Sequence, residues 1–204
     1  MDRNDVRKLY SIGNAKWYDP LRPVYSKLFL SKAEGDLANF LKDNLDESKT
    51  VLELGCGTGA NLEKIYSLNL EFKKYLGLDF SPDMLKIAKN KFRNNSIVEF
   101  RETDITELDD IKEQFDIIIC IIVISHLQSR PDFVNKSQRL LNKNGNFFLI
   151  LHTKPEWYIN FWLFPFIWLS RMSLISDDEI KKFENIKVIN KYSGNLITAI
   201  EIYR

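Results

Sequence analysis

Short apolar runs alternate with amphipathic stretches along most of the chain. A short apolar run bounded by turn residues is typical of a buried strand. Five runs have this character: residues 51–54, 75–80, 97–101, 115–124 and 147–151. Between them, apolar residues recur at the spacing of one helical face, most clearly in 31–45 and 130–143. Strands that alternate with helices predict an α/β fold with a parallel sheet.

The first predicted strand runs directly into a glycine-rich turn. Residues 53–59 read Glu-Leu-Gly-Cys-Gly-Thr-Gly, so a glycine occupies every second position from Gly55 to Gly59. Glycine adopts positive φ without strain, and a ligand can approach its backbone because it has no Cβ. The residues after the turn have helical spacing, so we expect a strand, a tight turn and a helix.

Two classes of cofactor site use such a turn. Dinucleotide-binding folds use the spacing G-x-G-x-x-G, whereas here Ala60 stands in place of the last glycine. Together with Glu53, two residues before the first glycine, the stretch resembles the first motif of class I S-adenosylmethionine-dependent methyltransferases. The resemblance covers roughly residues 17–204 and is loose after residue 152.

An acidic residue ends the second predicted strand. Asp79 lies about 20 residues beyond the glycine turn, the spacing at which Rossmann-type folds place a carboxylate on ribose hydroxyls. A carboxylate can accept two such hydrogen bonds at once. Ser81 and Pro82 then provide an N-cap and a first helical residue for the next helix.

The resemblance implies a role for each part of the site. The glycines would admit the methionine part of the cofactor, Asp79 would bind the ribose, and Asp104 with Ile105 would contact the adenine. The end of strand 115–124 would face the methyl group. The implied cofactor contacts are Glu53, Gly55, Cys56, Gly57, Gly59, Asn61, Asp79, Phe80, Met84, Asp104, Ile105, Cys120 and Ile121.

The last third of the chain completes the predicted sheet. Ser176 and Glu179 fit a capping box that opens a short helix, and residues 186–192 and 196–203 fit a hairpin. The resemblance therefore implies a seven-stranded, Rossmann-like sheet, mostly parallel with the last strand antiparallel and helices on both faces. We expect one domain over 1–204, with an N-terminal cap at 1–30 and an aromatic insert at 153–175.

The N-terminal 30 residues are irregular and rich in aromatic side chains. The run Trp-Tyr-Asp-Pro at 17–20, followed by Tyr25, resembles a lead-in of small methyltransferases. That resemblance implies that Tyr18 and Tyr25 help to form the acceptor pocket. The alternative is that these rings cover the edge of the core.

Residues 157–169 are unusually aromatic. Trp157, Phe161 and Phe164 share one helical face, but other large apolar residues cover the remaining faces. The segment has 13 residues and contains Pro165, so it is shorter than the ~20 residues of a membrane-spanning helix. It fits a lid over an apolar acceptor contacted by Trp157 and Phe161, a helix lying on a membrane surface, a homodimer contact, or ordinary packing.

Composition narrows the class of protein. The 204 residues suffice for one α/β domain, and a net charge of +1 gives no general attraction to nucleic acid. Two cysteines form no disulfide framework and no zinc motif, which fits a reducing cytoplasm. The polar N-terminus lacks a secretory pattern. We expect a cytoplasmic protein with no metal, in which residues 157–169 leave peripheral membrane contact open.

The sequence favours transfer of a methyl group from S-adenosylmethionine to a small, apolar or aromatic acceptor or a lipid head group, by direct displacement. The alternatives are RNA methylation and a non-catalytic cofactor-binding subunit that uses 157–169 as an interface. A general base is needed only for a hydroxyl or a protonated amine acceptor. The candidates are His126 and His152, the only histidines.

Overall fold

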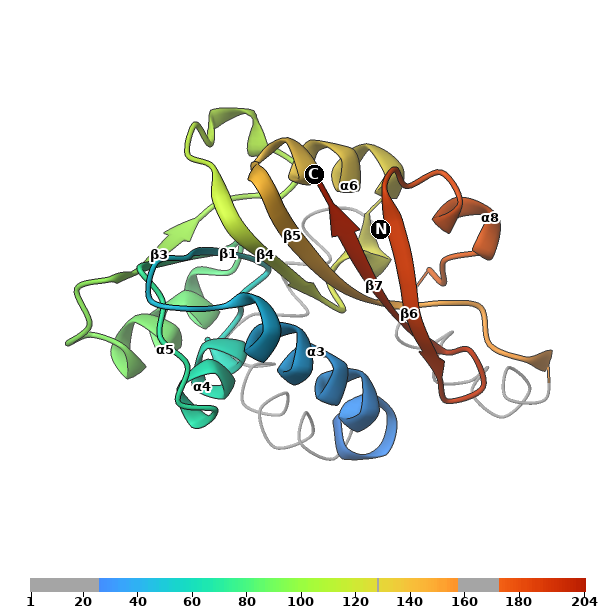
Figure 1. Cartoon of the computed structure of the whole chain (residues 1–204), viewed down its shortest axis with the longest axis horizontal. Coiled ribbons are helices and arrows are strands. Elements are labelled where there is room, and N and C mark those ends of the chain that lie inside the picture. Colours follow the sequence, from blue (N-terminus) through green and yellow to red (C-terminus); the bar gives the residue numbers. More distant parts are fainter. Residues whose placement is uncertain (1–25, 128, 158–172) are drawn as a thin grey trace.

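A seven-stranded sheet forms the centre of the fold (Figure 1). The computed structural model describes residues 26–127, 129–157 and 173–204. The strands of the sheet are β1 (Thr50–Leu54), β2 (Lys74–Asp79), β3 (Val98–Glu102), β4 (Phe115–Ile121), β5 (Leu141–His152), β6 (Ile186–Tyr192) and β7 (Ile197–Tyr203). They lie in the order β3-β2-β1-β4-β5-β7-β6.

The pairing confirms the predicted Rossmann-like sheet. The pairs from β3 through β2, β1 and β4 to β5 are parallel, whereas β7 runs antiparallel to both β5 and β6. Because β1, β2, β4 and β5 are parallel and run in the same direction, their carboxyl ends lie at one edge of the sheet. Ligands bind at that edge in open α/β sheets.

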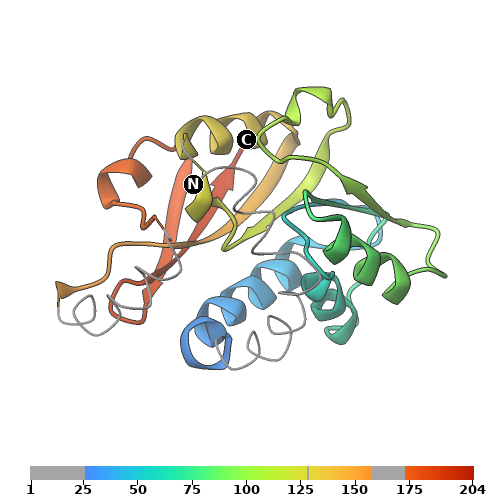
Figure 2. The ribbon, with the colours of Figure 1, turned by 180° about the vertical axis from the view of Figure 1, so that it is seen from behind.

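Helices cover both faces of the sheet, as Figures 1 and 2 show. The helices are α3 (Ser31–Asn44), α4 (Ala60–Ser67), α5 (Pro82–Lys91), α6 (Arg130–Arg139) and α8 (Asp177–Ile180). Helices α3, α4 and α5 pack on one face with Val51 and Ile117, and α6 and α8 pack on the other with Leu52 and Ile118. Successive strand residues therefore enter opposite cores, which explains their continuous apolar runs.

Strand β4 is shorter than the apolar run at 115–124 predicts. It ends at Ile121, because Ile122 has a φ of +58° and turns the chain away from the sheet. A short 3-10 helix, η3 (Ile124–His126), follows. Val123 packs on the glycine turn and Ile124 packs in the core, so both are apolar without belonging to the strand. The hydrophobic pattern of the sequence cannot distinguish such residues from strand residues.

The predicted helix over 130–143 is also too long. Helix α6 ends at Arg139, and β5 already begins at Leu141, which pairs with Phe115 of β4. Asn144 and Gly145 in sequence are typical of a helix stop, but Asn144 adopts a φ of +64° within an irregular stretch of the sheet. Leu141 is buried as a strand residue. The sequence pattern could not tell this from burial on the apolar face of a helix.

Two of three predicted helix starts are confirmed. The Ser81 hydroxyl accepts the Met84 N–H at 3.4 Å, and Ser176 forms a full capping box with Glu179. Ser31 and Glu34 also have the spacing of a capping box, but that prediction is wrong, because a π-helical turn, η1 (Ser26–Leu30), leads into α3 and no side chain caps it.

Candidate cofactor site

The glycine turn is held against the carboxyl end of β2. The N–H groups of Gly55 and Cys56 both donate to the Leu78 carbonyl, at 2.8 and 3.0 Å. The chain then turns through positive φ at Gly55, Gly57 and Gly59, with values of +76°, +52° and +81°. These values explain why glycine occupies every second position, since other residues are strained there.

The three glycines differ in what lies beside them. A Cβ on Gly55 would lie 2.4 Å from Val123, and one on Gly59 would lie 2.7 Å from Phe92, so both are packed against side chains. Among the described residues, a Cβ on Gly57 would meet nothing within 4 Å. The turn therefore has one backbone face that is open to a ligand, at Gly57.

Asp79 connects this turn to the start of α5. Its Oδ2 accepts the Gly57 N–H at 2.8 Å, and its Oδ1 accepts the Ser81 N–H at 2.9 Å. Burial raises the pKa of Asp79, and the two N–H bonds offset only part of that effect. An ionised carboxylate can accept about four hydrogen bonds, so Asp79 keeps capacity for ribose hydroxyls beside the open face of Gly57.

Glu53 lies beneath the turn, in the core. Its Oε1 accepts the Asn61 side-chain N–H at 2.8 Å, and its Oε2 accepts the hydroxyl of Tyr75. Glu53 is 1% exposed and Asn61 is 8% exposed. The hydrogen bond between Glu53 and Asn61 thus joins β1 to the first turn of α4.

The predicted adenine side is built around the loop after β3. Asp104 Oδ1 accepts the N–H and the hydroxyl of Thr106, at 2.9 and 2.7 Å, so this carboxylate shapes the turn that follows. Ile105 and Met84 are buried, at 6% and 3% exposure, whereas Phe80 is half-buried. Their contact with an adenine ring stays a prediction.

The carboxyl end of β4 borders the site. Cys120 is fully buried, and burial raises the pKa of its thiol, so it carries no thiolate nucleophile. Ile121 is half-buried, and the positive φ of Ile122 is costly for a β-branched residue. Strain of this kind concentrates at functional sites, which agrees with the predicted position of this strand end.

The two histidines differ in what the structure describes. His152, the last residue of β5, is 1% exposed, and its Nδ1 lies 3.2 Å from the hydroxyl oxygen of Ser125 in η3. His126 lies in the same short helix, but its side chain lies outside the described part of the structure. Of the candidate bases, His152 is therefore the one with a defined hydrogen bond, in a buried Ser–His pair.

The predicted acceptor residues fall mostly outside the described ranges. This holds for Tyr18, Tyr25 and Phe161, whereas Trp157 is described and is 80% exposed. Side-chain contacts with the acceptor therefore stay predictions.

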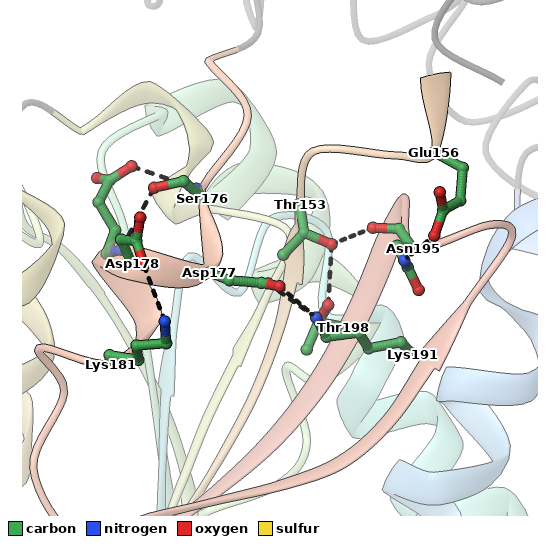
Figure 3. A network of polar contacts seen from close by, with 10 residues as sticks. Thr153, Glu156, Ser176, Asp177, Asp178, Lys181, Lys191, Asn195 and Thr198 are labelled. Carbon is green, nitrogen blue, oxygen red and sulfur yellow. Dashed lines mark hydrogen bonds and ion pairs between the residues drawn. The ribbon is translucent and has the colours of Figure 1, made fainter. Parts of the chain in front are cut away.

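The chain on both sides of the aromatic segment is held by polar contacts with the β6–β7 hairpin (Figure 3). Asn195 Nδ2 donates to Glu156 at 2.7 Å, and the Thr153 and Thr198 hydroxyls lie 2.8 Å apart. Lys191 pairs with Asp177 at 2.8 Å. The described residues before and after the segment are thus tied to the β6–β7 hairpin.

Neither a membrane-spanning helix nor a metal-binding cluster is found in the described residues. In residues 26–127, 129–157 and 173–204, no helix is both long and apolar enough to cross a bilayer. The same ranges contain no group of three or more histidine, cysteine, aspartate or glutamate side chains placed to hold a metal ion.

Known proteins share the fold of this chain, and one family resembles part of its sequence. The fold is that of class I methyltransferases. The solved structure of geranyl diphosphate C-methyltransferase from Streptomyces coelicolor superposes with a TM-score of 0.61 at 14% identity, covering 85% of this chain and 79% of that one. Residues 52–147 match the family described as a methyltransferase domain. Over those residues, which make up just under half of the chain, the protein is similar to this family.

Two curated relatives show the range of the likeness. A dTDP-4-amino-2,3,4,6-tetradeoxy-D-glucose N,N-dimethyltransferase from Saccharopolyspora spinosa is 30% identical over 117 residues, which cover 57% of this chain and 44% of the relative. A ubiquinone biosynthesis O-methyltransferase from Mesorhizobium japonicum is 28% identical over 160 residues, covering 73% of this chain and 63% of the relative. The chain thus spans less than two thirds of either relative.

Sequence reasoning missed three polar side chains around the site. Tyr75 contacts Glu53, Ser125 contacts His152, and the buried Arg130 holds the backbone after β4. A hydroxyl-bearing ring within the apolar strand 75–80 was a visible signal for Tyr75. The Ser125–His152 contact spans 27 residues and the Arg130–Glu179 contact spans 49, and no local pattern reports contacts at such separations.

Proposed function

We propose that the protein transfers a methyl group from S-adenosylmethionine to a small, apolar or aromatic acceptor or to a lipid head group. The observation that carries the proposal is the open backbone face of Gly57 beside the Asp79 carboxylate, at the carboxyl ends of β1 and β2. The family match over residues 52–147 supports it, as does the structural neighbour solved with S-adenosyl-L-homocysteine.

The residues of the chain fit this cofactor. When bound, S-adenosylmethionine supplies a methyl group on a positively charged sulfur. Asp79 would hold the ribose hydroxyls, and the glycine turn would admit the methionine part past Gly57. Because the leaving group departs neutral, the main tasks of the protein are to align the acceptor and exclude water, which can supply ~7–11 kcal/mol of the barrier.

Calorimetric titration with S-adenosylhomocysteine tests the cofactor part. We expect the wild type to bind and Asp79→Ala to bind at least about tenfold more weakly, since a buried hydrogen-bond acceptor for the ribose is lost. Asp178→Ala, an exposed aspartate of α8, is the matched control and should bind as the wild type does. Circular dichroism must show that each variant is folded. A folded wild type that binds no S-adenosylhomocysteine contradicts the proposal.

Transfer of a labelled methyl group identifies the acceptor class. Catechols, amines, thiols and vesicles containing phosphatidylethanolamine are offered separately with methyl-labelled S-adenosylmethionine. Label in one of these products supports the proposal. Label only in structured RNA supports the alternative of RNA methylation. Binding without transfer to any acceptor supports the non-catalytic subunit.

His152 is proposed as the base if the acceptor is a hydroxyl. Its support is the Ser125 hydrogen bond and its position at the carboxyl end of β5. With a phenol acceptor, His152→Gln should lower kcat, while the affinity for S-adenosylhomocysteine stays within about twofold, because the ring acts on the acceptor. An unchanged kcat contradicts this role.

A further inference from the structure

A chain of buried polar side chains lies beneath the glycine turn. The Tyr75 hydroxyl donates to one carboxylate oxygen of Glu53, and the Asn61 amide donates to the other at 2.8 Å. Tyr75 is 0% exposed, Glu53 is 1% exposed and Asn61 is 8% exposed. The chain crosses from β2 through β1 to α4, so it connects three elements that meet at the turn.

Ring packing fixes the direction of the Tyr75 hydroxyl. The Tyr75 ring lies edge-on to Phe100, with ring centres 5.9 Å apart, and tilted against Phe72 at 6.1 Å. Glu53 is opposite Gly77 in the parallel register, two residues beyond Tyr75. Residues two apart on a strand share a face, so Tyr75 and Glu53 lie on the same side of the sheet as α4.

The two donors to Glu53 are neutral. Burial raises the pKa of Tyr75, and the nearby Glu53 raises it further, so the phenol keeps its proton. Hydrogen bonds donated to a carboxylate favour its ionised form. After burial, the same Glu53 charge contributes to the raised pKa of the thiols of Cys56 and Cys120. The carboxylate field therefore reaches both the glycine turn and the end of β4.

We propose that Tyr75 is a positioning residue of the cofactor site, whose hydroxyl holds the Glu53 carboxylate in place beneath the glycine turn, where its charge favours a ligand with a cationic group. The inference rests on the proposed function, since S-adenosylmethionine and S-adenosylhomocysteine both carry a cationic amino group. Asn61 alone can hold one carboxylate oxygen but leaves the other without the Tyr75 donor.

Calorimetry with S-adenosylhomocysteine tests this role. Tyr75→Phe keeps the ring and removes only the hydroxyl. Loss of a hydrogen bond to a charged group is worth about tenfold or more. We therefore expect affinity to fall by about tenfold.

The matched control is Tyr66→Phe. Tyr66 belongs to the same aromatic cluster, 5.7 Å from Phe72, but its hydroxyl bonds to Asn95 at the surface. This variant should bind as the wild type does. An equal loss in Tyr66→Phe and Tyr75→Phe would overturn the inference, because the loss would then follow from loosened ring packing.

Glu53→Gln provides a second line of test. In the Glu53→Gln background, Tyr75→Phe should cause no further loss of affinity, because its target charge is gone. A full additional loss there, or wild-type affinity in Glu53→Gln alone, would overturn the inference. If the folded wild type binds no S-adenosylhomocysteine, the proposed function itself fails; the other contrary outcomes remove only the role of Tyr75.

Discussion

Single residues in the glycine turn divide between packing and ligand access. Gly55 and Gly59 are glycines because Val123 and Phe92 occupy the space where a Cβ would stand. Gly57 is a glycine with open space beside it. The sequence motif treats the three alike, and only the contacts separate the position that serves the fold from the position that faces a ligand.

This division predicts different effects of two alanine substitutions. Gly57→Ala should cost about 1–2 kcal/mol of stability, from positive φ alone, but should weaken S-adenosylhomocysteine binding by tenfold or more because its Cβ enters the open face. Gly59→Ala should destabilise more, since its Cβ would lie 2.7 Å from Phe92. Urea unfolding and calorimetry on both variants check this. Tight binding by Gly57→Ala would exclude a ligand at that face.

At the scale of elements, Asp116 joins the starts of three strands. Its Oδ2 accepts the N–H and hydroxyl of Thr50 at 2.8 Å, and its Oδ1 accepts the Asn142 amide at 2.9 Å. Partial burial alone would raise the pKa of Asp116, but these donors outweigh it and lower the pKa below the usual 3.8. Asp116 therefore ties β1, β4 and β5 together at the edge opposite the site.

Asp116→Asn should cost about 1–3 kcal/mol at pH 7, because an amide cannot accept from all three donors. The folded-state pKa is lowered, so the contribution is present above the usual aspartate value and is lost as pH falls below it. The difference from the wild type in urea unfolding should therefore shrink between pH 5 and pH 3. The exposed Asp110→Asn should unfold as the wild type does.

Helix α3 contains Gly35, and the described residues leave open space beside its Cα. Gly35 is exposed, and an added Cβ would meet nothing within 4 Å. Because alanine loses less backbone entropy in a helix, Gly35→Ala should raise the free energy of unfolding by about 0.5–1 kcal/mol. Urea unfolding measures this. A loss of stability would mean that this face of α3 has a contact beyond the described residues.

At the scale of the whole molecule, Arg130 connects the end of β4 to the C-terminal third. It donates to the Ile124 carbonyl at 3.3 Å, to the Ser173 carbonyl at 3.1 Å and to Glu179 at 2.8 Å. The guanidinium is almost fully buried, with a side-chain exposure of 7%. These bonds hold η3, which carries Ser125, against the chain that returns to the sheet after the aromatic segment.

Arg130→Gln should lower the free energy of unfolding by about 2–3 kcal/mol, since charge-assisted bonds of a buried group are lost. Lys181→Gln is the control, because Lys181 forms an exposed ion pair with Asp178 and should show no measurable change. Thermal and urea unfolding compare the two. Equal stability of both variants would contradict a structural role for Arg130.

The sequence alone determined the α/β class, the strand–turn–helix unit at Gly55 to Gly59, and the position of Asp79. These features are local, because strand and helix periodicity and positive φ are imposed by neighbouring residues. The sequence pattern placed the ends of β4 and α6 wrongly. Val123 is partly buried and Leu141 is buried outside these two elements, and a residue that packs in the core is apolar in a strand, a helix or a loop alike. Only tertiary structure decided which glycine faces open space and which side chains meet.

Tyr75 and Glu53 lie 22 positions apart, and Ser125 and His152 lie 27 apart. Their contacts follow from strand order and register, which no stretch of sequence contains by itself. Hydrogen bonds depend on distances of a few ångströms between such residues, so the sequence could indicate the chemistry of the site but not its supporting network.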